Sequence, residues 1–198
     1  SSDSRFDVIL LVSVGIIPAT KTFEPEKKLS RIDLAAWTVL ASGQTEAGDA
    51  PVISQLAEVA LAKGLIESLE GNASYADINK ALFMGKLSLE SATEIPTRAQ
   101  AASFVATNLA KGNKGETLLD KRGMSFGPTG EASKVESRMN PDGGTSYFIT
   151  IVDETYPVYS HGKVANGPTD LNLWQKRIVR RSIVRNLGGF TLWVYLEA

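Results

Sequence analysis

Two hydrophobic patterns divide this chain. In the first 110 residues, Leu, Ala, Ile and Val recur at three- and four-residue spacing, with Gly and Pro between the periodic stretches. This spacing places apolar side chains on one face of a helix. Ser30 and Thr97 stand directly before such runs, so each is predicted to cap a helix with its hydroxyl group. The predicted helices are Arg5–Val14, Ser30–Ala41, Val52–Lys63, Tyr75–Met84 and Thr97–Ala110.

The pattern changes after Lys111. Residues 112–130 are rich in Gly, Lys and Pro, which indicates a linker or a long loop. Beyond them, residues 147–152 and 190–196 are dense in β-branched and aromatic residues, as in strands. Weaker strand candidates are Ser133–Met139, Tyr156–Ser160 and Lys176–Arg185. We therefore predict an α+β chain, with a helical domain at 1–111, a linker at 112–130 and a small antiparallel β-domain, a sheet or a barrel, at 131–198.

The helical half contains an internal repeat. Ser30–Trp37 (SRIDLAAW) aligns with Thr97–Phe104 (TRAQAASF), because both read hydroxyl, Arg, apolar, polar, and then an apolar face that ends in an aromatic residue. A helix that ends in Gly precedes each copy, with Gly15-Ile16-Ile17 before the first and Gly85-Lys86-Leu87 before the second. Gly64-Leu65-Ile66 is a third such ending, without the downstream half.

These motifs resemble the S-layer homology (SLH) family. Its repeat is a helix ending in Leu-Gly-Ile-Ile, a loop with Phe-x-Pro, and a helix that starts with Thr-Arg-Ala-Glu. Phe23–Arg31 matches the loop and the helix start, while Ile95–Gln100 matches the helix start without Phe-x-Pro. Two complete copies cover residues 5–110, where three often make up a module of the family. The resemblance implies an all-α, SLH-like repeat bundle for the N-terminal domain.

The resemblance also implies a glycan site. In the SLH family the motif arginine lies in a groove between repeats and contacts an anionic cell-wall glycan, for which a guanidinium fork is geometrically suited. Arg31 and Arg98 inherit this role, with Asp33 and Gln100 at the acidic position of the motif. The alternative is structural: each arginine pairs with a helix C-terminus or with an acid such as Asp77. Both interpretations remain open at the level of sequence.

The composition of the chain argues against several classes of function. The formal net charge of -1 provides no general attraction to nucleic acid, so we expect no nucleic-acid partner. The apolar run from Val8 to Ile17 is too short to span a bilayer, so we predict no transmembrane segment. With no Cys and with His161 as the single histidine, we predict no catalytic residue, no metal site and no cofactor.

A basic stretch in the β-half offers a second candidate site. It has no acidic residue among its members, and one interpretation is that it binds acidic polysaccharide or lipopolysaccharide. The alternative is a solvated strand edge, on which positive charge blocks edge-to-edge pairing. Its basic residues are Lys176, Arg177, Arg180, Arg181 and Arg185.

Together these features favour a non-catalytic, extracytoplasmic envelope protein. We expect its partner to be a cell-wall or outer-envelope polysaccharide, with the β-domain contacting a partner or another copy. The alternative is a self-assembling subunit of an extracellular layer or filament, which is a homo-oligomer whose repeats are packing units. An enzyme with a divergent site in the β-domain is a third hypothesis.

Overall fold

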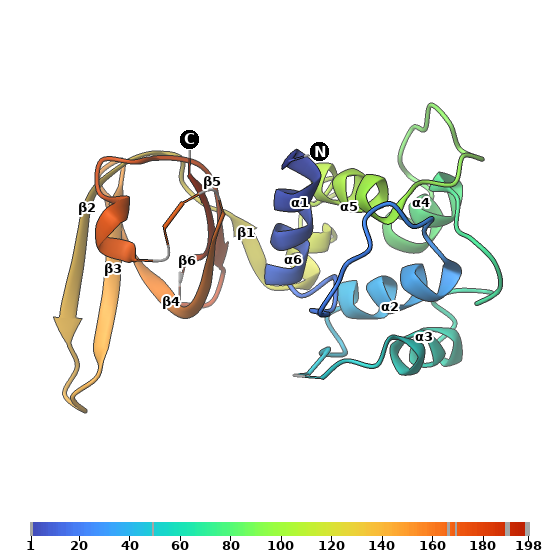
Figure 1. Cartoon of the computed structure of the whole chain (residues 1–198), viewed down its shortest axis with the longest axis horizontal. Helices are drawn as coiled ribbons and strands as arrows, with labels where there is room; N and C mark the ends of the chain where they lie inside the picture. Colours follow the sequence, from blue (N-terminus) through green and yellow to red (C-terminus); the bar gives the residue numbers. More distant parts are fainter. Residues whose placement is uncertain (1, 49, 166, 169, 189–190, 197–198) are drawn as a thin grey trace. The chain divides into compact units, whose positions relative to one another are not determined.

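The fold is described from a computed structural model. It describes residues 2–48, 50–165, 167–168, 170–188 and 191–196, and it excludes the side chains of residues 2–3, 159–165 and 192–193. The chain is α+β and divides into two compact units, residues 1–122 and 123–198 (Figure 1). The boundary falls inside the segment 112–130 that composition indicated as a linker. Each unit is described by itself.

The first unit contains the helices. The cap predictions are confirmed, because the hydroxyls of Ser30 and Thr97 each accept a hydrogen bond from the backbone N–H three residues on, and both helix starts form complete capping boxes. The five predicted helices lie within three residues of the predicted bounds at each end, and a sixth, α6, was not predicted. They are α1 (Ser2–Ser13), α2 (Arg31–Ala41), α3 (Ile53–Ala62), α4 (Tyr75–Phe83), α5 (Arg98–Thr107) and α6 (Leu118–Lys121).

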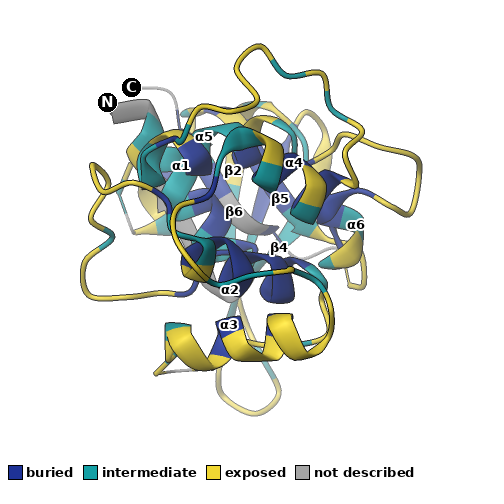
Figure 2. Cartoon of the chain, turned by 90° about the vertical axis from the view of Figure 1, so that its right-hand side faces the viewer, coloured by how far each residue is buried: buried dark blue, intermediate teal, exposed yellow. Residues whose placement is uncertain are grey.

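Helix α2 is the centre of this unit. Every residue from Asp33 to Ala41 is buried, and Trp37 is only 1% exposed, so the helix is surrounded by other chain segments (Figure 2). In α3, by contrast, Leu56, Ala57 and Ala60 are the buried residues, and its other face is exposed. A helix with one apolar face covers the core from outside, whereas a helix that is apolar all round lies within it.

Helix α6 corrects the linker prediction. Leu118 and Leu119 are each 2% exposed, so this short helix belongs to the core of the first unit. The backbone of α6 packs closely against Gly43, because a Cβ atom at Gly43 would lie 2.3 Å from the carbonyl oxygen of Lys121. The Gly and Lys residues of 112–117 therefore form a surface loop, and the chain after them returns to the helical core.

The second unit is a curled sheet. Its elements are β1 (Met124–Phe126), β2 (Gly130–Met139), β3 (Thr145–Ile151), β4 (Glu154–Ala165), the 3-10 helix η1 (Leu171–Trp174), β5 (Ile178–Arg185) and β6 (Thr191–Leu196). The strand order is β1-β5-β2-β3-β4-β6, and β5 also pairs with β6, so five strands close into a ring (Figure 1). All pairs are antiparallel except β4–β6, which corrects the expectation of a purely antiparallel domain. The closed ring of strands forms a small β-barrel.

The barrel has a small apolar interior. Trp174 from η1 packs among the inward side chains of the strands, and its indole N–H donates to the carbonyl oxygen of Pro168 at 2.7 Å. A buried indole with a satisfied N–H is a favourable core residue. The core consists of Ala132, Ile149, Ile151, Trp174, Val179, Val194 and Leu196.

Candidate functional site

Arg31 lies in a groove of the helical unit. Its guanidinium donates from Nη1 to the carbonyl oxygen of Glu70 at 2.6 Å, and Nη2 lies 3.5 Å from Oδ2 of Asp77. About a third of each side chain is exposed, 35% for Arg31 and 34% for Asp77. The groove has a volume of about 430 Å³, and Gly64-Leu65-Ile66 forms part of its wall. Arg31 therefore lies beside the third helix ending of the repeat pattern.

A second ion pair borders the same groove. Lys80 Nζ and Glu67 Oε1 are 2.8 Å apart, and both side chains are largely exposed. The hydrogen bond and the charge of Lys80 lower the pKa of Glu67, and the same contact with Glu67 raises the pKa of Lys80. The groove thus contains two cations and two carboxylates, and its contacts are open to water.

Arg98 occupies a different environment although its motif is the same. It forms an ion pair with Asp33, and only 13% and 10% of the two side chains are exposed. Its Nε donates to the carbonyl oxygen of Phe23 at 2.8 Å, and the guanidinium carbon lies 4.8 Å from the centroid of the Phe23 ring. Arg98 and Asp33 are therefore held inside the unit and have little surface for a ligand.

Gln100 has a local role. The side-chain Oε1 of Gln100 accepts from the backbone N–H of Thr97 at 2.9 Å, and the backbone N–H of Gln100 donates to Oγ1 of Thr97 at 3.1 Å. These two bonds are the reciprocal capping box of α5. The side chain is thus used to start the helix. The structure does not bring Gln100 together with Arg31.

The helical unit contains a third copy of the helix start. Ser74-Tyr75-Ala76-Asp77 opens α4 with a complete capping box, and it follows the Gly64-Leu65-Ile66 ending. This is the downstream half that the alignment did not find. Tyr75 stands where the other copies have Arg, which weakened the match. The Ser-x-x-Asp pattern was the signal that could have identified it.

The three copies meet in a ring of loops, which we call the loop ring and define as residues 25–30, 70–74 and 92–97. The first residue of each helix donates its backbone N–H to the loop before the next helix, in the order α2, α4, α5 and back to α2. The bonds run from Arg31 to Gly71 (3.0 Å), from Tyr75 to Glu94 (3.0 Å) and from Arg98 to Lys27 (2.8 Å).

Side chains follow the same direction round the loop ring. Arg31 at the start of α2 reaches Asp77 of α4, and Arg98 at the start of α5 reaches Asp33 of α2. At the remaining junction Tyr75 and Gln100 occupy the corresponding positions. Burial, and secondly the nearby charge of Glu94, raise the pKa of Tyr75. Two junctions are thus closed by ion pairs, and the third has neutral side chains.

Three residues of the basic stretch, Arg180, Arg181 and Arg185, lie on β5, which is not an edge strand, and Lys176 and Arg177 directly precede it. One side of β5 pairs with β2 and β1 and the other side pairs with β6, so the strand-edge interpretation is wrong. The register shifts between Val179 and Arg181, a bulge that leaves Arg180 and Arg181 both exposed. Arg180 lies over the Tyr195 ring, 5.7 Å from its centroid. Lys176 and Arg185 are exposed and Arg177 is partly buried.

No family model, curated protein or solved structure matches this chain. Within the described residues, no helix has the length and apolar character needed to cross a membrane. The same part of the chain contains no cluster of three or more His, Asp or Glu side chains arranged to hold a metal ion. The side chain of His161 lies outside the described residues.

Proposed function

We propose that this chain is a non-catalytic, extracytoplasmic envelope protein whose helical unit is a divergent SLH-like module that binds anionic envelope glycan in the Arg31 groove. The observation that carries the proposal is the position of Arg31, partly exposed in a groove beside Gly64-Leu65-Ile66. The third copy of the helix start supports it, since SLH modules often contain three repeats.

The contacts of Arg31 suit an exchangeable ligand. Its 3.5 Å contact with Asp77 is long and both partners are partly hydrated, so the pair contributes at most about 1 kcal/mol. A carboxylate of an acidic sugar can replace Asp77 at little cost and form a bidentate pair with the guanidinium. Lys80 on the same wall adds a second cation. Arg98 is assigned a structural role in this proposal, and the barrel contacts a partner or another copy.

The test is binding to purified anionic envelope polymer, measured by co-sedimentation over a range of salt concentrations. Arg31→Ala should weaken binding by about 1.5–3 kcal/mol, roughly tenfold or more, the scale of a hydrogen bond to a charged group. Arg31→Lys should recover little, because an ammonium lacks the planar fork. Arg5→Ala is the matched control, because Arg5 is an exposed arginine of the same unit that does not line the groove.

The alternative is a self-assembling subunit of an extracellular layer or filament. The observation that favours it is that Arg98 contacts Asp33 and Phe23 within the helical unit, so one of the two motif arginines is a packing residue. Failure of the parent protein to bind any anionic envelope polymer, together with ordered arrays of the purified protein in electron micrographs, would replace the glycan proposal with this one.

A further inference from the structure

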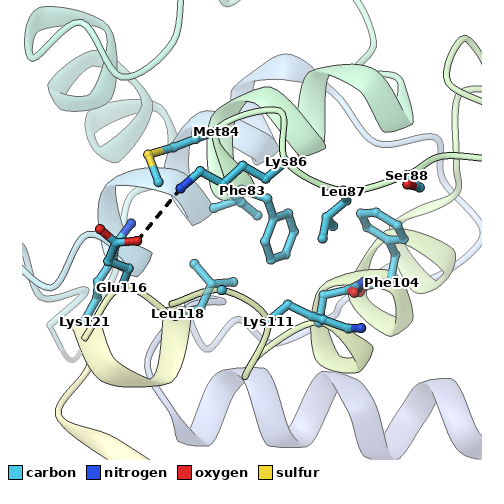
Figure 3. Close-up of a pocket in the computed structure, with 13 residues that line it drawn as sticks. Phe83, Met84, Lys86, Leu87, Ser88, Phe104, Lys111, Glu116, Leu118 and Lys121 are labelled. Atoms are coloured by element: carbon cyan, nitrogen blue, oxygen red, sulfur yellow. Dashed lines mark hydrogen bonds and ion pairs between the residues drawn. The ribbon is translucent and has the colours of Figure 1, made fainter. Parts of the chain in front are cut away.

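A second cavity of the helical unit has an apolar interior. It has a volume of about 460 Å³ and lies between the end of α4, helix α5, and the segment that leads into α6 (Figure 3). Leu82, Phe83 and Leu118 are buried in its wall, and Phe104 and Leu87 are partly buried there. The Phe83 and Phe104 rings meet edge to face, with centroids 6.1 Å apart. The volume is within the usual range for small-molecule sites.

The rim of this cavity is cationic. Lys86, Lys111 and Lys121 contribute three ammonium groups, and Glu116 is the one acidic residue of the lining. Glu116 lies 3.8 Å from Lys86 and also accepts from the side-chain amide of Asn113 at 3.1 Å. Within the described part of the chain, neither Lys111 nor Lys121 forms an ion pair. The positive charge of the rim therefore exceeds what Glu116 neutralises.

Met84 completes the rim with an adaptable apolar group. It is 60% exposed, and it stands beside Lys86 in Figure 3. Its φ of 53° is in the left-handed region, where a residue with a side chain costs about 1–2 kcal/mol more than glycine. The thioether is flexible and polarisable, so it can cover ligands of different shape. Aromatic walls, a methionine and free lysines are thus combined at one opening.

We propose that this cavity binds a small amphipathic carboxylate, with an aromatic or aliphatic body between Phe83, Phe104 and Leu118 and with its carboxylate toward the lysine rim. A neutral hydrocarbon would leave the ammonium groups of Lys111 and Lys121 without a partner, since Glu116 already pairs with Lys86. A sugar phosphate would bring hydroxyl groups against Phe83, Phe104 and Leu118, which cannot pair with them, and Ser88 and Asn108 are the neutral polar side chains of the lining. The cavity shares no lining residue with the Arg31 groove, so this proposal does not depend on the glycan proposal.

The experiment is an NMR titration of the full chain with naphthalene-2-carboxylate, with naphthalene-2-methanol as the neutral analogue. The acid should shift resonances of Phe83, Phe104 and Leu118 saturably and bind more tightly than the alcohol. Lys111→Met and Lys121→Met keep the aliphatic stem and remove the charge, and each should weaken binding of the acid by about two- to fivefold, the range for exposed ion pairs. Neither should change binding of the alcohol. Lys63→Met, an exposed lysine outside the lining, is the control and should have no effect.

Four results would contradict the proposal. Equal affinity for acid and alcohol would show that the lysine rim does not recognise the anion. Shifts confined to the barrel or to the Arg31 groove would show that the probe binds elsewhere. No saturable shift at millimolar acid would show that the cavity is not a site of this class. Phe104→Leu keeps an apolar wall while removing the ring, and unchanged affinity of this folded variant would also contradict the proposed pose.

Discussion

Arg98, the first residue of α5, is joined to Asp33, the third residue of α2, by an ion pair that is nearly buried. Removing one partner leaves the other charge unpaired, which typically costs about 3–5 kcal/mol. We expect Arg98→Ala to reduce the free energy of unfolding by about this amount. Arg31→Ala, at the equivalent position where about a third of the side chain is exposed, should cost less than about 1 kcal/mol. Urea denaturation of the two variants measures both values, and equal losses would contradict this difference.

Helix α6 should be required for folding of the helical unit. Residues 1–122 include Leu118 and Leu119, and also Arg122, whose Nε donates to the carbonyl oxygen of Val14 at 2.9 Å. Residues 1–111 lack all three, and each lost buried leucine typically costs about 2–5 kcal/mol. We expect 1–122 to melt cooperatively by circular dichroism and 1–111 to melt far lower or to be unfolded. Identical melting curves would place α6 outside the core.

Met84→Gly should stabilise the helical unit. Glycine adopts the left-handed conformation at this position without the Cβ penalty, and this gain exceeds the loss of a side chain that is 60% exposed. The expected gain is up to about 1 kcal/mol, measured as an increase in the urea midpoint. Met84→Ala is the control, because it removes the side chain but keeps the strain. A glycine variant no more stable than the alanine variant would show that the strain is absent.

Asp120 should contribute an acid-sensitive component of stability. Hydrogen bonds with the side chain and the backbone of Thr117 lower the pKa of Asp120 from the ordinary 3.8, and a hydrogen bond from the backbone of Gly115 lowers it further. Because the folded-state pKa is the lower one, the stabilisation is complete above pH 3.8 and is lost as pH falls through the folded-state value. Asp120→Asn should thus be less stable than the parent at neutral pH, and the difference should close in acid. A difference that stays constant down to the lowest pH would contradict this linkage.

Local patterns predicted helices α1 to α5, because the determinants of these helices are local. Ser30 and Thr97 indicate the starts of α2 and α5, because their hydroxyl groups cap these helices. The spacing of the apolar residues that follow predicts the buried face of each helix. Their place at the end of the repeat predicts that Trp37 and Phe104 are both buried, and this is confirmed for Trp37. Phe104, at the equivalent position, is only partly buried and lines a cavity. A repeat thus specifies the same backbone but not the same neighbours.

Features that depend on contacts between distant segments could not be predicted from the sequence pattern. Arg31 and Arg98 share one motif, yet about a third of Arg31 is exposed and Arg98 is nearly buried, because partners distant in sequence decide their burial. The five main strands were predicted in place, but β1 has only three residues, too few for a periodic signal. The pairing of β5 with β6 closes the barrel, and the bulge beside Arg180 interrupts the alternation that would have indicated which side chains face outward.

The loop ring has a consequence for the time course of folding. Its last hydrogen bonds run from Arg98 and Ala99 at the start of α5 back to Lys27 and Pro25, so the ring cannot close before α5 has been synthesised. Before α5 is synthesised, Asp33 of α2 lacks its partner Arg98, and part of the apolar surface of α2 stays exposed. Contacts between residues so far apart in the chain form late and slow folding. A nascent chain ending before α5 should therefore be the species of this protein most dependent on chaperones.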